Sequence, residues 1–250
     1  FKNYKKHLSY FHSRPDEGQY HAIQEGFKYT SGEIMAWLNA DDMYFPWTFK
    51  VVGHVFKKFK DVNWIIGLPS YFNKDGMLTK ISQYPASYEQ SFIRKGFYRS
   101  YLAGYLQQES IFWRRELWDK TKGLDLKWKY AADFELWTRF AMYDELVSVN
   151  APLAGFRMLP GEQKSSLYRN HYEEEVIKIC RSLSSPPLFW NFIAKRGVIH
   201  RTLCRLLIWK ISRIIAFFSE NDEWVLARSR RTISRSLFPN LLLEYKLRRR

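Results

Sequence analysis

The chain has 250 residues, 46% of them hydrophobic and 18% aromatic, a composition that excludes an intrinsically disordered protein. Its length allows one substantial core with an appendage. The formal net charge of +15 indicates an anionic partner, such as a nucleotide, a nucleic acid or a lipid headgroup.

The first predicted helix carries Tyr20, Ile23 and Phe27 at helical spacing, which turns these side chains toward a core. Asp16 or Ser13 is its expected N-cap, because short polar side chains accept hydrogen bonds from the free N–H groups of a first helical turn. A glycine then turns the chain into the first predicted strand.

A buried strand predicted over 33–39 leads into the most informative feature of the sequence. Its apolar residues 34–38 are followed closely by two adjacent carboxylates, Asp41 and Asp42. Ligands of open α/β sheets bind beyond the carboxyl ends of strands. Carboxylates there suit Mg²⁺ or Mn²⁺, which can hold a diphosphate. The local pattern leaves one alternative open, in which the pair caps the next segment and Pro46 lies in its first helical turn.

Strands alternate with helices along most of the chain, which predicts an α/β fold with a mostly parallel sheet. Serines and prolines at 182–187 end the last of these helices, so we expect a domain over 1–183 and an extension over 184–250. The other predicted elements are a helix over 48–59, a strand over 63–68, a hairpin turn at 73–76, a loop over 84–105, a strand over 109–113, a short helix over 116–122, a helix over 133–143, a final strand over 146–149 and a helix over 172–183.

Several blocks of the sequence occur together in one known family. In this order and spacing they resemble family 2 glycosyltransferases of the GT-A fold, which is the Rossmann-like α/β fold of nucleotide-diphospho-sugar transferases. The resemblance spans residues 14–170 and implies that the family's first strand lies before Phe1, so that this chain is truncated. The matching blocks are Asp16–Gly26, Thr30–Ile34, Trp37–Asp42, Gln107–Trp118 with Gly123–Asp125, and Tyr130–Arg139.

The resemblance implies roles for five acidic or amide side chains. Asp41 stands at the last carboxylate of the family's Asp-x-Asp motif and, with Asp42, would bind Mg²⁺ or Mn²⁺ at the donor phosphates. Asn39 stands where the motif's first Asp usually is and offers only a neutral amide oxygen. Asp16 matches an acidic position near the nucleotide, although a helix cap explains it equally well. Asp133 stands at the general base, and its alternative role is also a helix N-cap.

Other candidates lie on the acceptor side. The resemblance places Gln107, Gln108 and Glu109 along the acceptor pocket, although they can equally edge a strand. Arg157 falls in a predicted loop that can close over phosphates or remain at the surface. The chain has no Gln-x-x-Arg-Trp signature of processive polymerases, so transfer of a single sugar is favoured.

The charge excess lies mainly in the tail. Residues 186–250 hold 14 Lys and Arg against 4 Asp and Glu, a net charge of +10, which leaves +5 for the first 185 residues. We expect a basic amphipathic helix over 198–218 that carries Arg201, Arg205 and Arg213 and lies on an anionic membrane surface. The competing interpretation packs this helix on the domain with its cationic ends in solvent.

Together these features predict an inverting, hexosyltransferase-type glycosyltransferase. It would move one sugar from a nucleotide-diphosphate sugar to a saccharide or lipid-linked acceptor in cell-surface polysaccharide or lipopolysaccharide synthesis. Two cysteines are too few for a disulfide framework, and we expect a cytoplasmic, peripheral location at the inner face of the membrane. We assign this activity to the parent enzyme rather than to the fragment alone. The alternatives are a non-catalytic basic scaffold or a nucleic-acid-binding module, although no nucleic acid partner is expected.

Overall fold

The computed structural model describes residues 4–82, 85, 88–99, 104–159, 161, 167–183, 213–218 and 223–227. Its helices are η1 (Lys5–His7), α1 (Gln19–Phe27), α2 (Thr48–Lys58), α3 (Gln90–Arg94), η2 (Gln108–Ser110), α4 (Arg115–Thr121), α5 (Ala132–Tyr143) and α7 (Arg169–Ser182). Its strands are β1 (Ile34–Met35), β2 (Met43–Tyr44), β3 (Trp64–Ile66), β4 (Ser70–Phe72), β5 (Leu78–Ile81), β6 (Ile111–Arg114), β7 (Val147–Val149), β8 (Ala154–Arg157), β9 (Ile214–Phe218) and β10 (Glu223–Ala227).

Two sheets form the centre of the molecule. The larger has the order β1-β6-β3-β7-β9-β10 and the smaller β2-β8-β4-β5. In the larger sheet β1, β3, β7 and β9 run in one direction, while β6 and β10 run against them. The predicted α/β architecture, consistent with a GT-A fold, is therefore confirmed. The sheet is mixed rather than mostly parallel in its pairing, because β6 enters antiparallel between β1 and β3.

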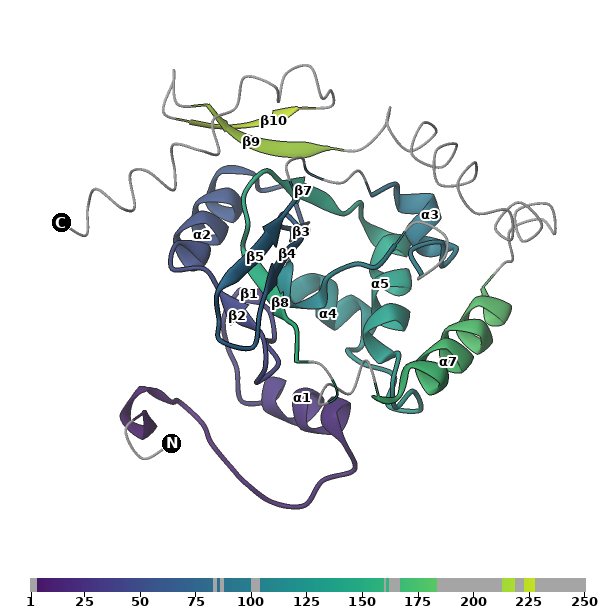
Figure 1. Ribbon diagram of the computed structural model, residues 1–250. Helices are drawn as coiled ribbons and strands as arrows, with labels where there is room; N and C mark the ends of the chain where they lie inside the picture. Colours follow the sequence, from purple (N-terminus) through teal and green to yellow (C-terminus); the bar gives the residue numbers. More distant parts are fainter. Residues whose placement is uncertain are drawn as a thin grey trace.

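Helices cover both faces of the larger sheet, with α2 on one side and α4 and α5 on the other (Figure 1). Successive side chains of the central strands point to opposite faces of the sheet, as in any β-strand. Trp64 and Ile66 pack in the core under α4 and α5, while Ile65 between them packs in the core under α2. This part of the molecule is thus a three-layer sandwich around a mixed sheet.

The predicted elements of the first half are found with different bounds. The strand expected over 33–39 is paired only at Ile34–Met35, so the polar tip that follows it is free to turn. The hairpin turn at 73–76 joins β4 to β5 as predicted. The stretch 84–105 contains the short helix α3 and is not simply a loop. The strand at 146–149 is not the last one, because β8 follows it and pairs with both β2 and β4.

The tail differs most from its prediction. The expectation of a helix over 198–218 is wrong for residues 214–218, which form β9 and pair with β7 of the first domain. Arg213, expected on a membrane-facing side, forms ion pairs with Asp61 and Glu145 instead. Residues 198–212 lie outside the described part of the chain. Within that described part, no helix has the length and apolar character to cross a bilayer.

Candidate active site

The polar tip after β1 forms a cluster of side chains that we call the donor-side cluster: Asn39, Asp41, Asp42, Gln108 and Glu109. Asn39 is its hub, because its Nδ2 lies 3.3 Å from Asp42 Oδ2 and 3.2 Å from Gln108 Oε1. Gln108 Nε2 in turn donates to the carbonyl of Trp37 at 2.8 Å. The cluster therefore joins the chain segments after β1 and before β6.

Arg157, at the end of β8, fixes the two aspartates from the other side. Its backbone N–H donates to Asp42 Oδ1 at 3.2 Å, and its Nε donates to the carbonyl of Asp41 at 2.7 Å. Arg157 lies in a strand rather than in the predicted loop, because β8 pairs with β2 directly after the aspartates. A guanidinium group beside two carboxylates can help to hold a phosphate.

The carboxyl groups of this cluster lie close together, and the charge of Arg157 acts on Asp42 to lower its pKa. Burial, assisted by the charge of Asp41, raises the pKa of Asp42 to about 6, against the opposing effect of its hydrogen bonds. Burial and the charges of Asp42, Asp41 and Asp133 raise the pKa of Glu109 to about 8. Buried carboxyl groups with raised pKa values are typical of functional sites.

The donor-side cluster fits a divalent cation held together with a substrate. Asp41 and Asp42 supply hard oxygen ligands, and the excess of negative charge between them is what a cation would neutralise. Asn39 is a poor ligand, since its Oδ1 already accepts from Gln19 Nε2 at 2.8 Å. No three His, Cys, Asp or Glu side chains of the described chain are grouped closely enough to hold a metal ion. Mg²⁺ usually takes one or two carboxylates, which Asp41 and Asp42 can supply, and completes its shell with substrate phosphates and water.

Asp133 lies in the first turn of α5, one residue after the helix starts. The N-cap is Ala131, so the predicted capping role of Asp133 is wrong. Tyr20 of α1 donates its hydroxyl to Asp133 Oδ1 at 3.0 Å. Burial raises the pKa of Asp133, although the backbone N–H of Phe134 and the Tyr20 hydroxyl both act to lower it. A partly buried carboxyl with a raised pKa is a suitable proton acceptor.

The loop that presents Asp133 is held by one carboxylate. Glu175 of α7 accepts hydrogen bonds from the backbone N–H groups of Lys129, Tyr130 and Ala131, each at 2.9 Å. Three charge-assisted hydrogen bonds fix the backbone immediately before α5. Glu175 thus sets the position from which α5 begins.

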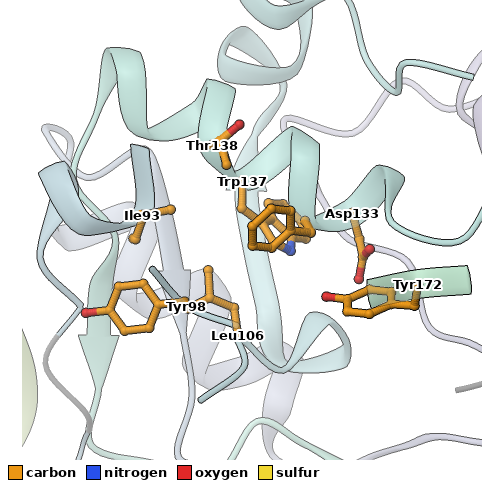
Figure 2. A pocket seen from close by; sticks show the side chains of 8 residues that line it. Ile93, Tyr98, Leu106, Asp133, Trp137, Thr138 and Tyr172 are labelled. Carbon is orange, nitrogen blue, oxygen red and sulfur yellow. The ribbon is translucent and has the colours of Figure 1, made fainter. Parts of the chain in front are cut away.

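Asp133 opens into a small pocket lined mainly by aromatic and aliphatic side chains. Figure 2 shows Asp133 and Tyr172 on one side of this pocket and Ile93 and Tyr98 on the other, with Trp137 one helical turn beyond Asp133. The indole of Trp137 stacks on Trp37 at a centroid distance of 5.7 Å. Asp133 is therefore anchored through its own helix to the aromatic core below the sheet.

The two halves of the site are brought together. The charges of Asp41 and Asp42 and the charge of Asp133 all act on Glu109, so these carboxyl groups lie within electrostatic range of one side chain. The first turn of α1 also reaches both halves, because Gln19 holds Asn39 while the adjacent Tyr20 holds Asp133. Helical spacing predicted that Tyr20 turns toward the core, where it is partly buried, but no local pattern predicted its contact with Asp133 or gave Gln19 a role.

Other predicted positions have mainly local contacts. Asp16 is exposed and accepts from the N–H of Gly18, which is the actual N-cap of α1, so neither Asp16 nor Ser13 caps the helix. Gln107 uses both ends of its amide on the backbone of Ser70 and so edges β4. The aspartate pair does not cap α2 either, because that helix begins after Trp47 with no side-chain cap.

The α/β fold, with carboxylates beyond β1 and at the start of α5, is consistent with the GT-A fold of nucleotide-sugar transferases. Residues 1–121 match the model of the family described as Glycosyl transferase family 2. This match supports a glycosyltransferase of the family 2 type, with a nucleotide-sugar donor and an acceptor as substrates. The donor-side cluster lies inside the matched residues and Asp133 lies beyond them. No curated protein matches the chain.

Proposed function

We propose that the protein is a metal-dependent, inverting glycosyltransferase. It moves a single sugar from a nucleotide-diphosphate sugar to a hydroxyl group of a saccharide or lipid-linked acceptor in the synthesis of a cell-surface polysaccharide or lipopolysaccharide. The observation that carries this proposal is the placement of Asp41, Asp42 and Asp133 within electrostatic range of Glu109. A sugar between a diphosphate and a base requires this arrangement.

Asp41 and Asp42 hold the diphosphate end of the donor, together with the guanidinium of Arg157. A divalent cation bound there would act as a Lewis acid that stabilises the departing nucleoside diphosphate. Asn39 and Gln108 keep the Asp42 carboxylate in place through their hydrogen bonds. These residues bind and orient, and they do not exchange protons with the acceptor.

Asp133 is the general base of the proposed reaction. Its carboxylate takes the proton of the acceptor hydroxyl while that oxygen forms a bond to the anomeric carbon of the sugar. The bond from this carbon to the phosphate oxygen breaks on the opposite face, and its electron pair leaves with the nucleoside diphosphate. One displacement at one carbon inverts the anomeric configuration.

The test is a donor panel. The chain is incubated with UDP-glucose, UDP-galactose, UDP-N-acetylglucosamine, GDP-mannose and dTDP-rhamnose, with Mn²⁺ or with EDTA. Release of nucleoside diphosphate is measured, and the anomeric configuration of any product is assigned by NMR. We expect one donor class to turn over only with the metal and with inversion. Retention of configuration, or equal turnover in EDTA, would contradict the proposed mechanism.

We also propose that the basic tail attaches the enzyme to the inner face of the membrane, in the cytoplasm. The net charge of +10 over residues 186–250 supports this attachment to anionic lipids. Co-sedimentation with vesicles tests it. Binding to phosphatidylglycerol vesicles and not to phosphatidylcholine vesicles is expected, with loss of binding at high salt. Equal binding to both vesicle types would contradict the electrostatic attachment.

A further inference from the structure

Glu109 is a buried carboxyl group that the proposed reaction does not use. It lies in η2, directly before β6, and its side chain is only 3% exposed. Its Oε1 atom has no hydrogen-bond partner in the described chain. Tyr44, Tyr71 and Tyr88 are all close enough for Glu109 to raise the pKa of their hydroxyl groups, yet none of the three donates to it.

Such an arrangement is costly for the fold. A buried acceptor without a partner loses its hydrogen bonds to water and gains nothing in exchange. Native proteins keep few such groups, and each calls for an explanation. The carboxyl group accepts a hydrogen bond from the backbone N–H of Glu109 itself. Its Oε1 atom receives none from the described residues, so it is open to a donor from a bound ligand.

The position of Glu109 indicates what that partner is. Its charge interacts with Asp42 and Asp41 at the diphosphate end of the proposed donor and with Asp133 at the proposed base. In the transfer reaction only the sugar ring lies between the diphosphate and the base. A carboxyl group within electrostatic range of both ends is placed to border the ring.

We propose that Glu109 binds a ring hydroxyl group of the transferred sugar and thereby determines which donor sugars the enzyme accepts. This inference rests on the proposed function. The hydroxyl donates to Oε1, the carboxyl oxygen that no described residue contacts by a hydrogen bond. The substrate class that follows is a sugar with a free hydroxyl at the contacted position, and deoxygenated or methylated sugars at that position are rejected.

The experiment measures the contribution of the sugar to binding separately from that of the nucleoside diphosphate. The full chain and the variants Glu109→Ala and Glu109→Gln are titrated by calorimetry, in Mn²⁺, with UDP, GDP and dTDP and with the corresponding nucleotide sugars of the donor panel. Glu116→Gln is the matched control, because Glu116 lies on the exposed side of the following helix, α4. Circular dichroism checks that each variant is folded.

We expect Glu109→Ala to weaken the binding of the accepted nucleotide sugar by roughly 2- to 10-fold, the value of a hydrogen bond to a neutral carboxyl group. The affinity for the bare nucleoside diphosphate stays within about twofold. Glu109→Gln retains an acceptor oxygen and so gives an intermediate loss. An equal loss of affinity for the nucleoside diphosphate and for the nucleotide sugar would overturn the inference, because Glu109 would then act on the cation or the fold.

A second measurement does not depend on the variants folding. Deoxy analogues of the accepted donor, each lacking one ring hydroxyl, are compared on the wild-type chain. One analogue should bind to the wild-type chain about as weakly as the natural donor binds to Glu109→Ala. The affinity for this analogue should not fall further in the Glu109→Ala variant. Uniform binding of all analogues would overturn the inference while leaving the proposed function intact. Failure of the wild-type chain to bind any nucleotide or nucleotide sugar would overturn the proposed function itself.

Discussion

The donor-side cluster and the surroundings of Asp133 differ in the groups that surround their buried carboxylates. The cluster gathers three carboxyl groups, holds them with the amides of Asn39 and Gln108, and leaves one oxygen of Glu109 without a partner. Asp133 borders a pocket of mainly aromatic and aliphatic side chains and receives one tyrosine hydroxyl, while the charge of Glu175 also acts on it. The first arrangement accumulates negative charge, while the second surrounds one proton acceptor with mainly apolar groups.

The difference separates binding from chemistry. Charge that accumulates between fixed carboxylates favours a cation and, through it, a diphosphate. A carboxyl group in mainly apolar surroundings and with a raised pKa favours proton transfer near neutral pH. If this comparison is correct, substitutions on the two sides should affect different measurements.

The largest effect is expected on the Asp133 side. Asp133→Asn removes the proton acceptor but keeps the size and hydrogen-bonding geometry of the side chain. The rate of sugar transfer should fall by roughly 10²- to 10⁴-fold. The affinity for the nucleoside diphosphate, measured by calorimetry, should not change. A wild-type transfer rate in this variant would remove Asp133 from the mechanism.

The next effect is expected on the donor side. Asp41→Asn or Asp42→Asn removes a charged oxygen, so the Mn²⁺ concentration for half-maximal nucleoside diphosphate binding should rise by at least roughly 10-fold. Asp75→Asn, in the exposed hairpin turn between β4 and β5, is the matched control and should leave this concentration unchanged. An unchanged metal requirement in both site variants would show that the cluster does not bind a cation.

A smaller and more diagnostic effect is expected for Tyr20→Phe. The Tyr20 hydroxyl lowers the pKa of Asp133 by donating to its carboxylate, so its loss should raise that pKa. A base with a higher pKa becomes deprotonated only at higher pH. The rising limb of the pH–rate profile should therefore move to higher pH, with a fall in kcat of roughly 10-fold. A fall in rate without movement of this limb would mean that Tyr20 acts only on the fold.

The smallest effect concerns stability rather than activity. Glu109 has a pKa of about 8 in the folded chain, raised first by burial, whereas its ordinary value is 4.5. Between these values the folded state holds a proton that the unfolded state has released, so stability falls as the pH rises through this window. The slope is at most about 1.4 kcal/mol per pH unit.

Glu109→Gln removes this titration. Its melting temperature should exceed that of the wild-type chain at pH 7 to 8, by a few degrees, and the difference should shrink toward pH 5. Glu116→Gln should show no such pH dependence, since Glu116 is exposed. A constant difference across this range would mean that Glu109 is not held protonated in the fold.

The sequence predicted the layered α/β fold because its long helices have strong apolar periodicity. Residues 48–59 and 133–143 correspond closely to α2 and α5. The direction of β6 was missed, since periodicity shows that a strand exists and says nothing of its partner. The strand β9 was missed because its apolar residues also fit a helical spacing, and pairing with β7 decided between the two.

The site was predicted in part. Adjacent carboxylates after an apolar run identified Asp41 and Asp42, and the family resemblance added Asp133 and Glu109. The site contacts of Gln19, Tyr20 and Glu175 were not predicted, because each acts through a partner far away in the sequence. Glu175, for example, holds a backbone segment 44 to 46 positions earlier. Only the folded chain brings such pairs together.

The pairing of β9 with β7 has a practical consequence for anyone who trims this protein to its first 183 residues. Removing β9 would leave β7 as a bare sheet edge, with backbone N–H and C=O groups ready to recruit a strand from another molecule. The shortened protein would tend to aggregate even though every proposed catalytic side chain is still present. The low solubility of the shortened protein would then result from the loss of β9 and not from a defect in the site.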